Sequence, residues 1–241
     1  MKKTMRAVAT GVFVLIAGST HAQTPGPSKN IFVDVNFGFQ AISQTITVSS
    51  TPIIYGEIAF IDSTQDVTGS PFLDVTAGYR IWKDFSVALG LATTFNRSQT
   101  AQVSASIPSP VFFDRRVVSN ITVTDLEHKE RSASLLFAWT TPISDKMDAA
   151  VLAGPTFIKV FQGLVTNVDV PANTQTANPH AEEQTGTKVG FSIGGDITYL
   201  VRPRVGVGGM ARYVRAHADL PSVSDLKIGG FQFGGGLRLR F

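Results

Sequence analysis

Three histidines outside the first 22 residues are the side chains of this sequence best suited to acid–base chemistry. Hydrolytic sites usually hold such a histidine within hydrogen-bond reach of a serine nucleophile and a carboxylate. His128, His180 and His217 all fall in or beside segments that we expect to be loops, and no catalytic motif surrounds them. We interpret each as a solvated loop residue, and we expect neither enzyme activity nor a bound cofactor. The spacing of His180, Glu182 and Glu183 could bind a cation weakly, but it is unspecific for any metal.

Seven charged residues form the second candidate group, because they recur on the polar side of segments in which apolar and polar residues alternate. Charges that leave water must be paired, since a lone buried charge costs several kcal/mol. We therefore expect a salt-bridged network with a structural role, in which Asp34 lies between Arg80 and Arg238. The residues of this predicted network are Asp34, Asp74, Arg80, Asp196, Arg212, Arg238 and Arg240.

The N-terminus has the layout of a secretory signal peptide, which we place at residues 1–22. Three basic residues precede an apolar run that is too short to span a bilayer, and Thr20-His21-Ala22 fits a cleavage site. The leader holds three of the 21 basic residues and no acidic residue, which leaves 18 basic against 18 acidic residues. A neutral mature chain gives no support to a nucleic-acid partner. The sequence contains no cysteine, so disulfides are excluded.

Beyond a short Pro-rich segment at 23–30, which we expect to be flexible, period-2 alternation recurs along the whole chain. No segment sustains a helical apolar stripe. The pattern predicts an all-β chain from 31 to 241. Eight strands are expected, at 31–41, 72–81, 85–96, 132–141, 149–159, 188–201, 205–215 and 228–241.

The connections between these strands alternate in length. Tight turns at 82–84, 142–146 and 202–204 alternate with longer, mostly polar connections at 42–70, 98–130, 160–187 and 216–227. This plan predicts an antiparallel up-and-down transmembrane β-barrel with short periplasmic turns and long extracellular loops. Because 101–107 and 117–126 alternate again, a hairpin above the membrane is expected there, and 53–61 could extend in the same way.

Aromatic residues on the apolar faces fall at two levels of the expected strands. From Phe85 to Phe95 is ten residues, which at about 3.3 Å per residue and a tilt of roughly 40° spans about 25 Å. That height matches the apolar band of an outer-membrane barrel. The lower belt is predicted to contain Tyr79, Phe85, Trp139, Tyr199 and Phe241, and the upper belt Phe39, Phe95, Phe157, Tyr213 and Phe231.

The mature chain resembles the small eight-stranded outer-membrane β-barrels, the OmpA-like and OmpX-like group. In that family the last strand closes with an upstream glycine, alternating apolar residues and a C-terminal aromatic, which here are Gly236, Leu239 and Phe241. The resemblance implies location in the outer membrane of a Gram-negative cell and insertion by the barrel-assembly machinery, which reads this assembly signal. We expect the barrel alone, without the further domain that OmpA carries.

Two function classes follow from this architecture. Eight strands leave an interior that side chains can fill, so a structural or surface-interaction barrel with a plugged polar lumen is favoured. Its loops would meet lipopolysaccharide, other outer-membrane lipids or an unknown surface ligand, with the apolar segment 107–113 as a candidate contact. The alternative is a narrow pore or a transporter of ions or small solutes. A soluble ligand-binding barrel is weaker, since it would need an apolar interior and a polar exterior.

Overall fold

The computed structural model describes residues 30–95, 98–171 and 178–241, and these residues are almost entirely β-strand. No helix in these three ranges is long and apolar enough to cross a membrane. The predicted signal peptide and nearly all of the 23–30 segment lie outside the described residues, so both stay predictions. The strands are β1 (Ile31–Ser50), β2 (Ile53–Ile54), β3 (Glu57–Ile58), β4 (Phe60–Trp82), β5 (Phe85–Thr94), β6 (Gln99–Pro108), β7 (Arg116–Leu126), β8 (His128–Ser144), β9 (Met147–Asp169), β10 (Asn178–Arg202), β11 (Val205–Leu220) and β12 (Val223–Arg240).

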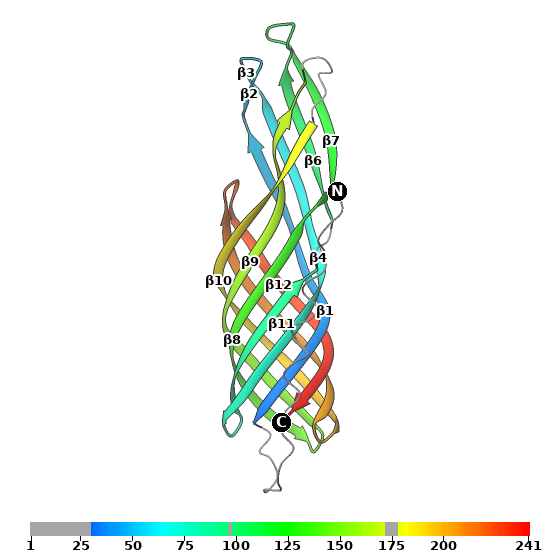
Figure 1. Cartoon of the computed structure of the whole chain (residues 1–241), viewed down its shortest axis with the longest axis vertical. Helices are drawn as coiled ribbons and strands as arrows, with labels where there is room; N and C mark the ends of the chain where they lie inside the picture. Colours follow the sequence, from blue (N-terminus) through cyan, green and yellow to red (C-terminus); the bar gives the residue numbers. More distant parts are fainter. Residues whose placement is uncertain (1–29, 96–97, 172–177) are drawn as a thin grey trace, which may run out of the picture.

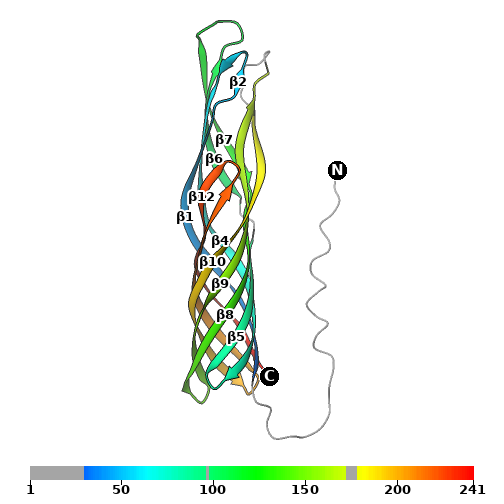
Figure 2. The same ribbon diagram turned by 90° about the vertical axis from the view of Figure 1, so that its left-hand side faces the viewer.

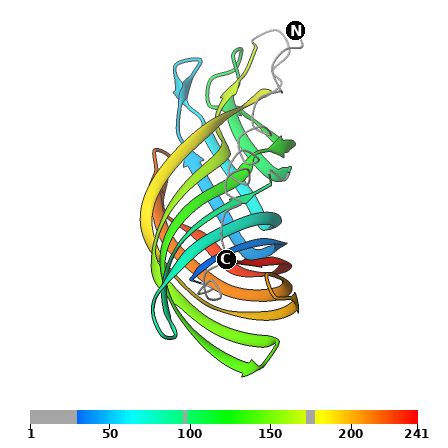
Figure 3. The same ribbon diagram turned by 60° about the horizontal axis from the view of Figure 1, so that its bottom comes forward.

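Eight of these strands close into an antiparallel barrel, as Figures 1 and 3 show. The order around the barrel is β1, β12, β11, β10, β9, β8, β5 and β4, and β4 pairs back with β1. Closure is direct, because Asp34 of β1 lies opposite Arg238 of β12 on one side and Thr76 of β4 on the other. The predicted all-β, eight-stranded up-and-down barrel is confirmed.

One end of the barrel carries the three tight turns, β4–β5, β8–β9 and β10–β11, and is called the turn end below. The C-terminus lies at this end (Figure 1). Ile31 and Phe241 exchange two backbone hydrogen bonds, of 3.2 and 2.8 Å, so the last residue is joined to the first strand. The terminal aromatic residue is therefore part of the closed sheet.

The other end extends far beyond the expected strand limits (Figure 2). The connections predicted at 42–70, 98–130, 160–187 and 216–227 are mostly strand: the β1–β4 ladder, for example, continues to Ser50 opposite Ile61. The hairpin expected from 101–107 and 117–126 is confirmed as β6 and β7, which add to the edge of β4. Within 53–61 the chain makes a small β2–β3 hairpin, turning at Tyr55 and Gly56 with positive φ.

The extension remains β-sheet because apolar and polar residues still alternate there. In this part, however, the apolar side chains point into the barrel and the polar ones point outward. In the upper part of β1, Ile46 and Val48 are buried, whereas Thr45, Thr47 and Ser49 are exposed. This is the pattern of a barrel surrounded by water. Twelve buried residues form one apolar core inside it: Ile46, Val48, Val67, Ile158, Val160, Leu164, Val214, Ala216, Ala218, Leu220, Leu226 and Ile228.

Candidate functional site

The lower barrel interior gathers three carboxylates and three arginines into one network. Arg240 Nη1 lies 2.5 Å from Asp34 Oδ1, and Arg238 Nε lies 3.9 Å from the same oxygen. Alternation on β1 and β12 points these side chains inward, and the Asp34–Arg238 register of the two strands places them at the same height. Six of the seven predicted charged residues therefore meet here, with equal numbers of positive and negative charges.

Arg238 is the centre of this network. It is fully buried and bonds Asp196 through two contacts, Nη2 to Oδ2 at 2.6 Å and Nε to Oδ1 at 3.2 Å. Its Nη1 also donates to Asn36 Oδ1 at 2.7 Å. Such a fork-to-carboxylate geometry is the strong form of ion pair, and it holds β12 to β10 and β1 at once.

A second ion pair, between Arg212 and Asp74 at 3.1 Å, lies next to the first group. Asn36 joins the two, because its Nδ2 donates to Asp74 Oδ1 at 3.0 Å while its Oδ1 accepts from Arg238. Thr198 similarly links Arg240 to Asp196. These neutral residues were not predicted as members of the network, although their inward position in the alternation was a usable signal.

Arg80 is the one member of the predicted network that does not join it. The expected Asp34–Arg80 pair is wrong: among the described residues Arg80 forms no ion pair. The cause is the register, since the β4 residue opposite Asp34 is Thr76. Arg80 lies four residues further along β4, about 13 Å towards the turn end at 3.3 Å per residue.

The cavity beside the Asp34 and Asp196 carboxylates is small. A cavity of about 40 Å³ is lined by Asp34, Asn36, Thr76, Arg80, Asp196 and Arg240, among others. A polar cavity of that size holds only a few water molecules.

A second polar cluster, centred on Glu130, lies inside the barrel further from the turn end. The Glu130 carboxylate accepts hydrogen bonds from Gln40 Nε2 at 2.8 Å and from the Gly229 amide at 3.1 Å. Gln232 Nε2 donates to Gln40 Oε1 at 2.8 Å, which extends the cluster to β12. This cluster was not predicted, because 98–130 was expected to be a loop.

His128 belongs to the same cluster, and its interpretation as a solvated loop histidine is wrong. It is 1% exposed, and its Nδ1 lies 2.6 Å from Gln162 Oε1. Its Nε2 lies 3.6 Å from Glu130 Oε1. His180 and His217 are exposed as expected, beside Asp169 and Asp225 respectively, but they lie in strands β10 and β11 and not in loops. Across the described residues no group of three or more potential metal ligands is gathered.

The charge of His128 depends on these neighbours. Gln162 Nε2 donates to the Gly163 carbonyl, so Gln162 Oε1 faces the ring as an acceptor and His128 Nδ1 carries a proton. A neutral ring would then turn the Nε2 lone pair towards the Glu130 carboxylate. Burial lowers the pKa of His128, but the hydrogen bond and the charge of Glu130, with the Gln162 contact, outweigh burial and raise the pKa.

This arrangement predicts a pH-dependent stability. A histidine whose pKa is raised on folding contributes stability that is complete below its unfolded pKa, about 6.5, and is lost as the pH rises through the folded value. We expect the free energy of unfolding in detergent to fall from pH 6 to pH 9. The variant H128Q should lack the part of this pH dependence that His128 contributes. Urea titrations at a series of pH values measure it, and a parallel slope in H128Q would contradict the assignment.

The outer surface of the lower barrel is apolar and bounded by aromatic residues. Phe85, Trp139, Tyr199 and Phe241 near the turn end are each about half exposed, as are Phe157 and Phe231 at the upper level. Between the two levels the outward side chains are mostly leucine, valine, isoleucine, alanine and glycine, with further phenylalanines such as Phe37, Phe137 and Phe233, whereas the inward ones carry the charges. Such a surface is stable only in contact with lipid. The chain is an outer-membrane β-barrel. Because barrels of this kind have short periplasmic turns and longer extracellular connections, we assign the turn end to the periplasm and the extended end to the outside of the cell.

Comparison with known proteins gives structural likeness only. No protein-family model matches the chain, and no curated protein matches it. One similar solved structure is Neisserial surface protein A, with 14% sequence identity and a TM-score of 0.49; the match covers 90% of this chain and 100% of that chain. Another is outer membrane protein OprG from Pseudomonas aeruginosa, with 9% identity and a TM-score of 0.47; the match covers 88% of this chain and 95% of that chain. A third is Ail, the attachment invasion locus protein of Yersinia pestis, with 13% identity and a TM-score of 0.39; the match covers 87% of this chain and 99% of that chain. The barrel assignment rests on the strand pairing and surface of this chain.

Proposed function

We propose that this barrel is a structural or surface-interaction protein with a plugged lumen. The observation that carries the proposal is the succession of three packed layers along the barrel axis. The Arg238 network occupies the periplasmic half, and the Glu130 cluster lies above it beside Ile158 and Val214. The rest of the apolar core, which includes Ile46, Val48 and Leu226, continues from there into the extracellular part. An ion crossing the barrel would have to displace buried, mutually paired charges and then enter an apolar core, which is unfavourable.

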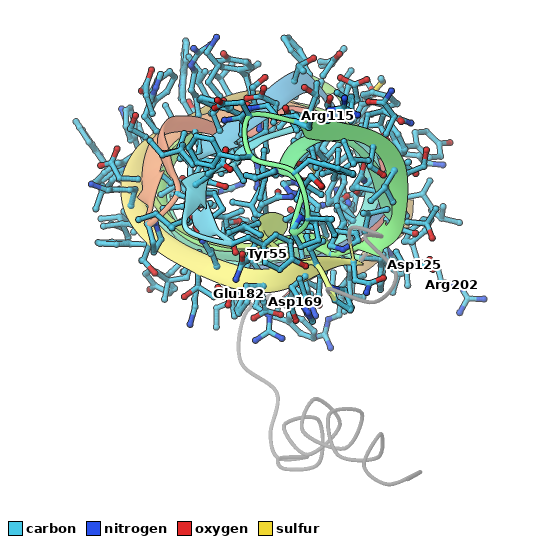
Figure 4. The ribbon with its side chains drawn as sticks, turned by 90° about the horizontal axis from the view of Figure 1, so that it is seen from above. Tyr55, Arg115, Asp125, Asp169, Glu182 and Arg202 are labelled. Carbon is cyan, nitrogen blue, oxygen red and sulfur yellow. The ribbon has the colours of Figure 1, made fainter. Side chains whose placement is uncertain are left out.

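The extracellular end supports the interaction part of the proposal. The tip patch, as we call it, consists of six exposed apolar residues from the β2–β3 and β6–β7 hairpins, where Phe113 reaches 80% exposure. Arg115 lies over the Phe112 ring at 5.0 Å, and Arg116 lies over Phe60 at 4.9 Å. Figure 4 shows Tyr55 and Arg115 at this end. The members of the tip patch are Ile53, Ile58, Val111, Phe112, Phe113 and Val118.

Exposed apolar residues flanked by arginines suit a partner whose surface is apolar and negatively charged. The proposal predicts that F112S/F113S leaves stability within about 0.5 kcal/mol of wild type, because both rings are exposed. The same variant should reduce the attachment of bacteria displaying the protein to epithelial cells. K83S/K146S, at the periplasmic turns, is the control. Equal attachment by wild type, the tip variant and cells lacking the protein would contradict the surface-interaction role.

A further inference from the structure

Three basic side chains lie together on the outer surface of β8 and β9. Arg131 and Lys159 are direct partners across the β8–β9 ladder, and Lys129 is paired with Phe161 at the next outward position. Phe157, 55% exposed in the upper aromatic belt, precedes Lys159 by two residues on the same strand face. Two residues of a strand tilted by roughly 40° rise about 5 Å along the barrel axis. The three cations are thus at the level of the outer-leaflet headgroups.

The arrangement of these cations is unfavourable without an anion. Like charges directly opposite each other on neighbouring strands are destabilising. Both cations also approach a single ring, with Arg131 Cζ 5.3 Å and Lys159 Nζ 4.9 Å from the centroid of Phe161. Both charges therefore lie beside the same ring.

No carboxylate neutralises this cluster: among the described residues, Lys129, Arg131 and Lys159 form no ion pair. Lys188, on the extracellular half of β10, differs because it bonds Asp219 at 2.8 Å. On β10, the residues opposite Lys159 and Phe161 are Thr187 and Thr185, which bring no charge.

We propose that Lys129, Arg131 and Lys159 bind a phosphate group of a phosphorylated glycolipid in the outer leaflet, of the lipid A type. The guanidinium of Arg131 and the two ammonium groups would share the phosphate oxygens, while the rings of Phe157 and Phe161 contact the sugar and the first acyl carbons. This site goes beyond the proposed function, because it involves neither the lumen nor the tip patch. It would fix the depth and orientation of the barrel in an asymmetric membrane.

Native mass spectrometry of the purified, folded protein tests the site, with bisphosphorylated lipid A as the probe. Wild type should retain the lipid, and R131Q/K159Q should bind it about 30-fold more weakly, which corresponds to about 2 kcal/mol for two cations near a membrane surface. The matched control is R202Q/R204Q, which removes two exposed arginines at a periplasmic turn and should bind like wild type. Equal affinity of R131Q/K159Q and the control would overturn the proposal.

Two further measurements distinguish binding of the lipid phosphate from binding of acyl chains or of free phosphate. Lipid A with the same acyl chains but no phosphate should bind R131Q/K159Q and wild type alike, and tight binding of it to wild type would overturn the proposal. Displacement of lipid A by an equal concentration of inorganic phosphate would also do so.

The stability of K159Q separates a binding role of the cation from a structural one. In detergent without lipid A, K159Q should be as stable as wild type or more stable, because it relieves the repulsion between Lys159 and Arg131. Urea titration measures the difference. A destabilised K159Q would mean that the cation holds the barrel together, which would contradict the proposal.

Discussion

Replacing Arg238 with methionine is expected to lower the free energy of unfolding by about 3–5 kcal/mol, the range for breaking a buried ion pair. The substitution keeps much of the side-chain volume but removes both contacts to Asp196 and the hydrogen bond to Asn36. Asp196 would remain inside the barrel without its arginine. Urea titration of the protein folded in detergent micelles measures the change.

Two companion variants make this prediction specific. R80M removes an arginine at the same end of the barrel that has no ion pair among the described residues, so a loss below about 1 kcal/mol is expected. D196N/R238M removes the orphaned charge and should recover part of the stability lost in R238M. Similar losses in R80M and R238M would contradict the central position of Arg238.

Substitution of Gly236 by alanine should have the second large effect. A Cβ atom at Gly236 would meet only backbone: the Val35 carbonyl oxygen, its carbon and the Asn36 Cα, all within 3.0 Å. The contact lies at the β1–β12 seam, where Asn36 is directly opposite Gly236 and the barrel closes. Overpacking costs about 1–3 kcal/mol and more where backbone must move, so we expect a loss of about 3 kcal/mol.

The matched control for this substitution is Gly209, two strands from β1 and facing lipid. A Cβ atom there would find its nearest neighbour, the Gly234 carbonyl oxygen, at 3.7 Å, an ordinary contact. G209A should therefore fold as well as wild type. Heat-modifiable gel mobility and urea titration of both variants measure the difference. A fully stable G236A that failed only in cells would instead favour a role for Gly236 in recognition by the assembly machinery.

The membrane-spanning part of the fold was predictable because lipid outside and a polar interior force a strict alternation. Strand 85–96 shows this alternation almost without exception, and the structure has β5 at Phe85–Thr94. That Asp34 and Arg238 lie opposite each other was also predictable, because the first and last strands pair when the barrel closes. The β4 residue opposite Asp34 was not predictable. Register across a closed barrel depends on the stagger of every strand, and sequence periodicity carries no information on stagger.

The extracellular half was harder to predict for a different reason. There the polar side of each strand faces water, so Thr45, Thr47 and Ser49 made the segment look like a polar loop. The buried partners in the alternation, Ile46 and Val48, were the signal that it was a strand. The burial of His128 and Glu130 depended on recognising β8 as longer than its membrane-spanning part.

Planar-bilayer recording of the purified wild-type barrel tests the central claim, the plugged lumen, most directly. The three filled layers predict that insertion produces no stable unitary currents, under conditions in which an open porin used as a positive control conducts. Reproducible unitary steps from wild type, absent from protein-free detergent, would contradict the plugged lumen and support the narrow-pore alternative.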